Sequence, residues 1–355
     1  MLSTLSWRFS LENHQRADRR PLWVEANASQ LAAKIKLPGA LKRAAPATLR
    51  PVLATLVDAV PTKADDWVFE AKFDGYRLLA RLDSKGVRFF TRNGHDWTSK
   101  LPHLAKALTS MKLSHGWLDG EIIAPAESGQ PSFQVLQNAF ESARTRDIVY
   151  YVFDVPYYDG YDLSRVALSE RRVLLESLLS NATPPILLSQ AFAGLPGDLL
   201  KAACAAGLEG IIGKRKRSLY ASRRSPDWIK LKCSRRQEFV IGGWTDPKGS
   251  RTGLGSLLLG VHDSGGALIY AGKVGTGFDE RLLRSLRTKL ESLAISTRPF
   301  SGPVPGERQV HWVKPKLIAE VAFSEWTHGG HLRHPVFQGL RTDKPAKGIV
   351  REEPV

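Results

Sequence analysis

The chain has 355 residues, a formal net charge of +16, and hydrophobic and charged fractions of 43% and 24% that are typical of a globular protein. Its length exceeds what one hydrophobic core usually supports, so we expect two domains. Apolar runs fall short of the roughly 20 residues that span a bilayer, and the first residues lack the apolar core of a secretory signal. The positive charge therefore favours nucleic acid as the partner, with no membrane.

The two cysteines, Cys204 and Cys233, form no metal-type pair. In a chain without a secretory signal this usage is typical of a reducing compartment. We therefore expect reduced thiols and a cytoplasmic, nucleoid-associated protein.

In chain order, residues 1–50 carry scattered basic residues without periodicity and are expected to form an irregular extension. Short apolar, alternating segments then predict strands, and helical patterns lie between them. The expected strands are 67–82 with a turn at its Phe-Asp-Gly, 87–94, 117–124, 149–160, 208–215 and 228–233, and the expected helices are 132–143 and 169–180. Residues 51–233 are therefore expected to form an α+β domain with mostly antiparallel sheets.

We expect residues 234–355 to form a second domain. The segments 239–244, 256–263, 268–275 and 317–327 predict strands, and 279–293 predicts one amphipathic helix with a leucine stripe. Several strands with one helix in this length fit a small β-barrel such as an OB-fold.

The stretch 70-EAKFDGYR-77 places Lys72 between carboxylates. An ordinary lysine has a pKa near 10.4, so only about one in a few thousand is neutral at pH 7, and an amine must be neutral to attack phosphorus. We expect burial and the nearby cations Arg77, Lys230 and Lys232, with a divalent metal, to lower the pKa of Lys72. The same cations would neutralise a transferring phosphoryl group.

Other segments supply partners for such a site. In 228-WIKLKC-233, Trp228, Lys230 and Lys232 share one strand face, and two neighbouring lysines call for an anion such as phosphate between them, unless the face is simply solvated. Asp119, Glu121 and Glu209 could form structural ion pairs, or carboxylates among them could hold Mg²⁺. Phe153 could be a core aromatic or a stacking surface for a nucleobase.

The ordered series of short motifs resembles the covalent nucleotidyltransferases, which include polynucleotide ligases and capping enzymes. The motifs are 72-KFDGYR-77, 91-TRNG-94, 119-DGE-121, 153-FD-154, 209-EGIIGKR-215 and 230-KLK-232. In the second domain, 272-GKVGTGF-278 and 333-RHPVFQGLRTDK-344 are similar to the OB domain of ATP-dependent DNA ligases, especially the ligase module of bacterial ligase D end-joining enzymes. The resemblance covers about residues 50–345 and implies an adenylation domain over 51–233 and an OB-fold over 234–355.

The resemblance also implies roles for individual residues. Lys72 would become lysyl-AMP, and Glu209 and Glu121 would hold Mg²⁺ or Mn²⁺. The remaining positions would bind ATP. Glu70 would contact adenine, partly through its main chain, Phe153 would stack on adenine, and Glu121 would contact the ribose. Arg77 and Arg92 would lie near the ribose, phosphates or nick end, Lys230 and Lys232 at the α-phosphate, and Arg341, Asp343 and Lys344 at the pyrophosphate. The junction at 233–237 would act as the hinge. From the basic charge of the chain, Lys248 and Arg251 could contact DNA phosphates, unless residues 246–253 form a simply solvated loop.

The implied activity is ATP-dependent sealing of nicked or broken double-stranded DNA in bacterial DNA repair, by a monomer that could work with a Ku-like end-binding protein. An RNA ligase or a GTP-using relative, and a basic DNA-binding protein without catalysis, are the alternatives. We expect ATP rather than NAD as the AMP donor, because nothing in residues 1–50 resembles a nicotinamide-recognition domain. The sequence leaves open whether the chain stands alone or belongs to a longer protein.

Overall fold

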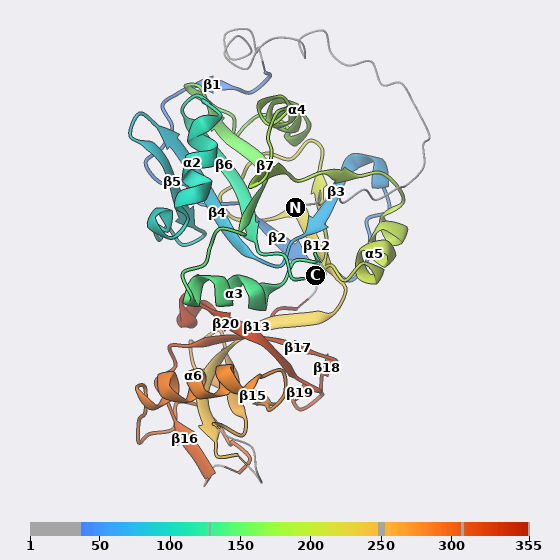
Figure 1. Ribbon diagram of the computed structural model, residues 1–355. Helices are drawn as coiled ribbons and strands as arrows, with labels where there is room; N and C mark the ends of the chain where they lie inside the picture. The colour runs from blue at the N-terminus through green and yellow to red at the C-terminus, as the bar shows by residue number, and fades with distance from the viewer. Residues whose placement is uncertain (1–36, 128, 248–252, 307–308, 354–355) are drawn as a thin grey trace.

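A computed structural model describes residues 37–353, apart from residue 128, residues 248–252 and residues 307–308. Two bodies lie one above the other in Figure 1. The upper body contains two β-sheets and the lower body contains the remaining large sheet. None of the helices in the described part of the chain has the length and apolar character needed to cross a bilayer.

The first sheet of the upper body is seven-stranded. Its order is β1 (Leu41–Lys42), β8 (Tyr161–Asp162), β7 (Val149–Tyr158), β6 (Gly116–Ile123), β4 (Tyr76–Asp83) and β5 (Gly86–Thr91), and β9 (Ile186–Leu188) pairs with β7. Alternation in β4 buries Leu78, Ala80 and Leu82 in a core shared with α2 (Pro102–Ser110) and α3 (Phe133–Glu141). Both α2 and α4 (Leu168–Leu178) add leucines to this core.

The second sheet carries most of the predicted motifs. Its order is β10 (Ala191–Phe192), β3 (Trp67–Lys72), β11 (Gly210–Arg215), β12 (Arg224–Lys232) and β2 (Leu53–Leu56). The apolar side chains Ile211, Ile229 and Leu231 pack beneath α5 (Pro196–Ala205). The opposite face meets the first sheet through a small cluster that includes Phe153 and Trp228.

Chain reversal between β3 and β4 brings the two sheets together directly after Lys72. At Gly75 a β-carbon would lie 2.0 Å from the carbonyl oxygen of Ile122, so only glycine allows this approach. The turn therefore fixes Lys72 at the mouth of the space between the sheets.

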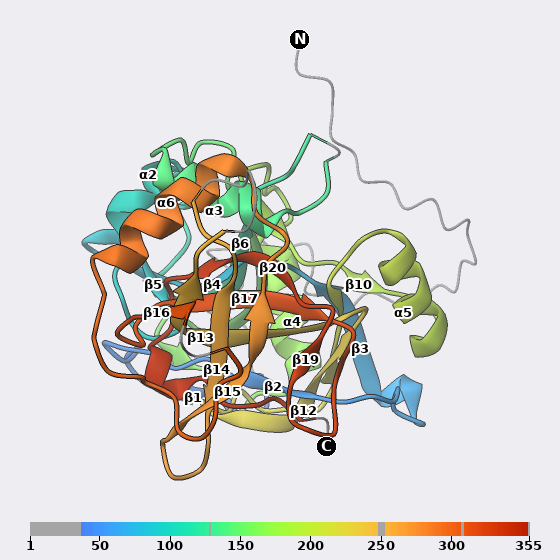
Figure 2. The same cartoon turned by 90° about the horizontal axis from the view of Figure 1, so that it is seen from below.

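The lower body is a barrel-like sheet packed against an α-helix. Its order is β15 (Leu268–Val274), β14 (Leu257–His262), β13 (Arg235–Thr245), β17 (Ile318–Phe323) and β20 (Val336–Arg341), and β16 (Val310–Trp312) pairs with β13. A separate hairpin joins β18 (Glu325–Trp326) and β19 (Leu332–Arg333). Seen from below in Figure 2, α6 (Glu280–Glu291) lies along one side of these strands.

The helix α6 is stabilised by a side-chain cap at its N-terminus and by burial of its apolar stripe. The Asp279 side chain accepts a hydrogen bond from the backbone N–H of Leu282 at 2.7 Å and so caps the first turn. Leu283, Leu286 and Leu290 are buried in the core of the lower body. This confirms the predicted leucine stripe and the OB-type second domain.

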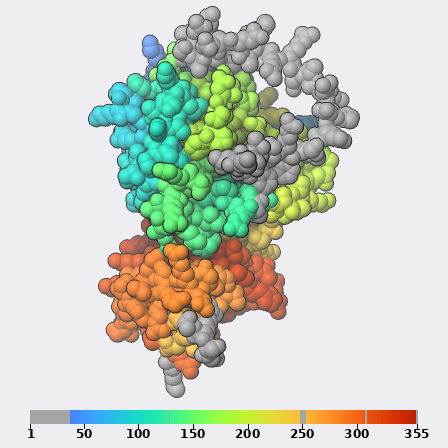
Figure 3. Space-filling model, viewed as in Figure 1, coloured from blue at the N-terminus to red at the C-terminus, as the bar shows by residue number. Residues whose placement is uncertain are grey.

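The two bodies form an interface with one another. In Figure 3 the green surface around α3 rests against the orange and red surface of the C-terminal body. An ion pair of 2.9 Å between Lys289 on α6 and Glu141 on α3 crosses this interface, and α3 also packs against β20. The structure is therefore a closed arrangement of the two domains.

Most predicted elements are present within a few residues of their expected ends, and the predicted α+β class with mostly antiparallel sheets is confirmed. The helices α2 and α5 and the strands β2 and β20 were not predicted. Short strands and helices of this kind are fixed by packing on the sheets rather than by their own periodicity. Part of the expected irregular extension, Leu41–Lys42, forms the edge strand β1.

Candidate active site

A cleft lies between the two sheets of the N-terminal domain and is covered by the C-terminal domain. Its lining contains every residue predicted for the site. These residues are Glu70, Lys72, Arg77, Arg92, Glu121, Phe153, Glu209, Lys230, Lys232, Arg341 and Lys344. Asp343 lines the same cleft, whereas Lys248 and Arg251 lie outside the described residues.

Lys72 ends β3 and faces Glu209, which precedes the neighbouring strand β11. The Lys72 Nζ lies 2.6 Å from Glu209 Oε2. Burial by itself would lower the pKa of Lys72, but the carboxylates of Glu209, Glu121 and Asp74 outweigh it and raise that pKa. The expectation of a lowered pKa is therefore wrong for this state: a carboxylate, not a cation, is the nearest neighbour, and Lys72 is held as an ammonium.

Glu70 precedes Lys72 by two residues and lies on the same face of β3. Its carboxylate is buried and accepts hydrogen bonds from Arg172 (2.5 Å), Ser189 (2.7 Å) and Lys214 (2.8 Å). Burial lowers the pKa of Lys214. Three donors engage the Glu70 carboxylate, so this side chain is held by contacts within the protein.

Aromatic side chains form one wall of the cleft. The rings of Phe153 and Trp228 lie 6.2 Å apart and edge-on. The Arg77 guanidinium lies 4.9 Å from the centre of the Phe153 ring, and Lys214 Nζ lies 4.3 Å from it. Phe153 is 8% exposed, so it belongs to a core cluster and also lines the cleft.

Asp119 positions Arg77 from the adjacent strand β6. The guanidinium donates two hydrogen bonds to the Asp119 carboxylate, of 2.8 and 2.5 Å, and the Tyr220 hydroxyl donates a third of 2.6 Å. Asp119 is fully buried. This bidentate pair removes rotational freedom from Arg77 and aims its cation at the cleft.

Glu121 lies two residues beyond Asp119 and points into the cleft. Burial raises its pKa to about 7, although Lys72, Arg77 and Arg341 oppose the shift. Its carboxylate has no hydrogen bond or ion pair with the described residues, and the described residues contain no group of three or more His, Cys, Asp or Glu suited to a metal. Among the carboxylates that act on Lys72, Glu209 and Glu121 have the largest effects on its pKa, which makes them the two candidates to hold a cation.

Lys230 and Lys232 point into the cleft from β12, and an anion does lie between them. It is the carboxylate of Glu352, with Oε1 at 2.9 Å from Lys230 Nζ and Oε2 at 3.1 Å from Lys232 Nζ. Burial and Lys232 lower the pKa of Lys230 to about 8, against the opposing effect of Glu352. The expected phosphate position is therefore held by a side chain of the protein itself, and no motif predicts this contact.

The C-terminal domain reaches the cleft through Arg341. Its guanidinium donates to Asp343 (2.9 Å) and Glu320 (3.0 Å), and it lies over the rings of Tyr76 and Phe133 at 5.0 and 4.6 Å. The predicted last motif is thus placed against the N-terminal domain.

A second bridge joins the domains at the predicted hinge. Arg236, the second residue of β13, pairs with Asp74 of the β3–β4 turn at 2.8 Å and with Glu320 of β17 at 3.4 Å. Lys344 pairs with Glu238 on β13. Arg236, Glu238 and Glu320 have no motif of their own, so sequence reasoning missed them.

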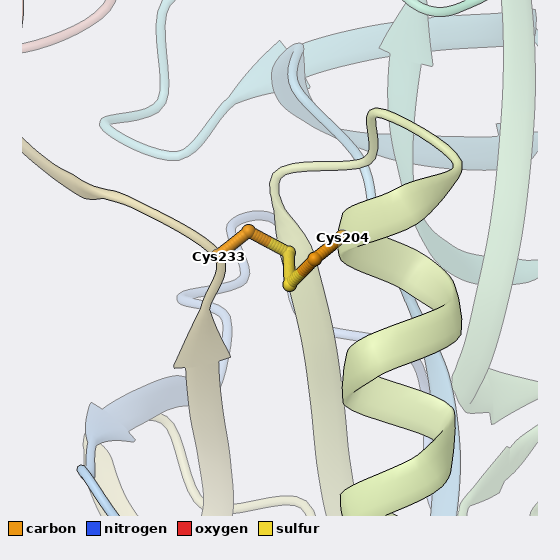
Figure 4. Close-up of a disulfide and its surroundings, with 2 residues drawn as sticks. All are labelled: Cys204 and Cys233. Atoms are coloured by element: carbon orange, nitrogen blue, oxygen red, sulfur yellow. A yellow bond between two sulfur atoms is a disulfide. The ribbon is translucent and has the colours of Figure 1, made fainter.

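The two cysteines are joined. Cys204 on α5 and Cys233 after β12 form a disulfide, with their Cα atoms 5.2 Å apart (Figure 4). The expectation of reduced thiols is wrong for this structure, because α5 packs on the sheet and brings together residues 29 positions apart in the chain. The backbone N–H of Cys233 also donates to the carbonyl of Glu209 at 3.0 Å, so the crosslink lies next to the site.

Comparison with known proteins agrees with this geometry. Residues 51–232 match the family described as ATP dependent DNA ligase domain, and residues 250–344 match the ATP dependent DNA ligase C terminal region. The chain is 50% identical over 315 residues to the multifunctional non-homologous end joining protein LigD of Pseudomonas aeruginosa, covering 87% of this chain and 37% of that protein. It is 42% identical over 313 residues to the LigD protein of Mycobacterium tuberculosis, covering 86% of this chain and 40% of that protein.

The chain therefore spans less than half the length of these curated relatives. A solved structure of similar size is that of a mycobacterial DNA ligase D complexed with ATP and MES. It is 40% identical with a TM-score of 0.64, and the match covers 86% of this chain and 98% of that one. Because one family matches half of the chain and this solved ligase is covered almost completely, the chain belongs to the ATP-dependent DNA ligases.

Proposed function

We propose that this chain joins a 3′-hydroxyl to a 5′-phosphate in double-stranded DNA through an AMP carried on Lys72. The observation that supports this most is the convergence in one cleft of a nucleophilic amine, a pair of lysines and an aromatic wall. The amine can attack phosphorus, the lysines can neutralise a phosphate, and the wall can hold a base.

In the first step, neutral Lys72 attacks the α-phosphorus of ATP. A nitrogen–phosphorus bond forms while the bond to pyrophosphate breaks, and the proton of the attacking amine is released. Lys230 and Lys232 stabilise the negative charge on the α-phosphate, and Arg341 and Lys344 orient the pyrophosphate. Phe153 stacks on adenine, the main chain at Glu70 reads the base, and Arg77, Arg92 and Glu121 position the ribose and phosphates.

In the second step, the AMP passes from Lys72 to a DNA 5′-phosphate, and in the third a 3′-hydroxyl displaces the AMP. Both steps need the same charge neutralisation and in-line alignment as the first, so one cleft can serve all three. The C-terminal domain must first leave the position over the cleft to admit DNA. The hinge is residues 233–237, where the Arg236 bridge has to open.

Mg²⁺ or Mn²⁺ fits beside Lys72. Glu121 has a carboxylate without a partner among the described residues, and Glu209 is occupied by the Lys72 ammonium alone. Two carboxylates completed by substrate phosphate oxygens are a usual arrangement for Mg²⁺. When bound, the ion would neutralise phosphate charge and weaken the hold of Glu209 on the proton of Lys72.

The biological substrate we propose is a broken DNA duplex in a bacterium, with repair as the role. Relatives of this chain are named for non-homologous end joining. The net charge of +16 suits a polyanion and predicts binding that weakens steeply with salt. We propose that the chain acts as a monomer in the cytoplasm and that a Ku-like protein could deliver the ends.

Sealing assays test the proposed function directly. Wild type should close a nicked DNA duplex with ATP and Mg²⁺ but not with GTP, and faster than it closes the matching RNA nick. Lys72→Ala should lose sealing, whereas Lys85→Ala, which removes an exposed lysine remote from the cleft, should retain it. Sealing of RNA alone, or full activity of Lys72→Ala, would contradict the proposal.

A further inference from the structure

Glu352, near the C-terminal end of the described chain, is hydrogen-bonded to both Lys230 and Lys232. It lies 122 and 120 residues after Lys230 and Lys232, and each of its carboxylate oxygens accepts from one of their ammonium groups. No motif singled out Glu352. A carboxylate held in this way offers two oxygens to two cations, as a phosphate group would.

Hydrogen bonds to the backbone on either side of Val350 fix the position of the Glu352 carboxylate. The side chain of Gln237 on β13 donates to the carbonyl of Val350 at 3.0 Å and accepts from the N–H of Glu352 at 3.1 Å. Gln237 is 4% exposed, and Ile349 is buried in the core of the C-terminal domain. The segment 349–352 is therefore anchored on both sides of Val350, which distinguishes this contact from a chance surface pair.

The Glu352 side chain is negatively charged at neutral pH. Burial by itself would raise the pKa of Glu352, but Lys232 and Lys230 lower it to about 2. Its carboxylate is therefore anionic throughout the neutral range. The next residue, Glu353, is instead paired with Arg351 at 3.3 Å and is 69% exposed. Glu352 contacts the lysine pair, whereas Glu353 pairs with Arg351 instead. Glu353 is therefore a suitable control for removing one glutamate charge at this end of the chain.

The anchor belongs to the C-terminal domain, whereas the lysines belong to the N-terminal domain. Both lysines and Glu352 line the same cleft. A nucleotide phosphate and the Glu352 carboxylate would compete for the positive charge of the same two ammonium groups, each of which already donates one hydrogen to Glu352.

We propose that Glu352 is an internal anionic ligand of the Lys230–Lys232 pair, which the α-phosphate of ATP displaces on binding. This inference rests on the proposed role of the two lysines. Glu352 then sets the apparent affinity for ATP and keeps the cleft in a closed, charge-balanced state before the nucleotide enters. Removing its charge strengthens ATP binding, which is the opposite of what removal of a substrate-binding or supporting residue does.

The test is single-turnover formation of lysyl-AMP by the full chain over a range of ATP concentrations. Glu352→Gln should lower the apparent KM for ATP about fivefold, the size expected for loss of one partly exposed competing ion pair, with the maximal rate within about twofold of wild type. Glu353→Gln, the matched control, should leave both values unchanged. An unchanged or raised KM in Glu352→Gln would overturn the proposal.

A binding measurement separates this inference from the proposed function. ATP binding is measured by calorimetry in Lys72→Ala and in Lys72→Ala with Glu352→Gln, neither of which can react at that residue. Tighter binding by the double variant supports the competition even if wild type forms no lysyl-AMP, and equal or weaker binding contradicts it. Glu352→Ala repeats the comparison in case the glutamine variant does not fold.

Discussion

The amine of Lys72 and the carboxylate of Glu209 form a direct ion pair of 2.6 Å across two neighbouring strands. Gly210, the residue after Glu209, is the antiparallel ladder partner of Lys72, so the strand register itself creates this contact. The proposed nucleophile is thus a protonated, paired group in this structure. The residue that keeps it protonated is also one of the two candidate metal ligands.

Replacing Glu209 should therefore affect the metal requirement as well as the rate. Glu209→Gln keeps the shape of the side chain but removes its charge, so we expect lysyl-AMP formation to fall by about 100-fold. The Mg²⁺ concentration needed for half-maximal rate should rise, which a metal titration measures. Glu127→Gln, an exposed carboxylate outside the cleft, is the control. A slow variant with the wild-type metal dependence would show that Glu209 is not a metal ligand.

The pH dependence of ATP binding should report on Lys230. Its pKa is lowered to about 8, chiefly by burial and by Lys232, so it carries a positive charge below pH 8 and loses it above. The apparent KM for ATP in lysyl-AMP formation should therefore rise as the pH increases through about 8.

Lys230→Arg provides the matched comparison. A guanidinium stays charged over this range, so its KM should be flat between pH 7 and 9 even if its rate is lower. If wild type and Lys230→Arg showed the same rise above pH 8, another group would be responsible.

Arg236 should control closure of the two domains. Arg236→Ala removes the cation between Asp74 and Glu320 and leaves two carboxylates facing each other, which favours opening. We expect a larger radius of gyration by small-angle scattering and about a tenfold slower reaction with ATP. Joining of DNA that already carries AMP should change less, because that step uses the open form. Arg235→Ala, an exposed neighbour, should behave as wild type, and equal scattering of all three proteins would contradict the role.

The disulfide should contribute to stability. Its crosslink spans 29 residues, for which loss of chain entropy in the unfolded state predicts about 3–4 kcal/mol. Denaturant unfolding of the N-terminal domain should shift to lower concentration in reductant, and Cys204→Ser should match the reduced wild type. Two titratable thiols in the folded protein without reductant would show that the crosslink does not form.

The motifs allowed the family, the fold class and the converging strands to be predicted, because alternation in β3, β6 and β12 fixes which side chains face the cleft. The family expected from those motifs is confirmed. The partners of the motif residues could not be predicted in the same way. Arg172 at Glu70, Arg236 at Asp74 and Glu352 at the lysines belong to none of the recognised motifs, and only tertiary packing brings them near.

The cysteines illustrate the same limit. Two isolated cysteines carry no spacing signal, and their pairing depends on where α5 docks against the second sheet. The reversed direction of the Lys72 pKa has a similar origin. The sequence shows which cations share the site, but the strand register decides that a carboxylate is closest.

The most direct test of the account is to locate the AMP by mass spectrometry after incubating the full chain with ATP and Mg²⁺. We expect a single added AMP on the peptide that contains Lys72, lost on brief acid treatment and absent from Lys72→Ala. An AMP on another lysine, or unmodified protein that still seals nicked DNA without any covalent intermediate, would contradict it.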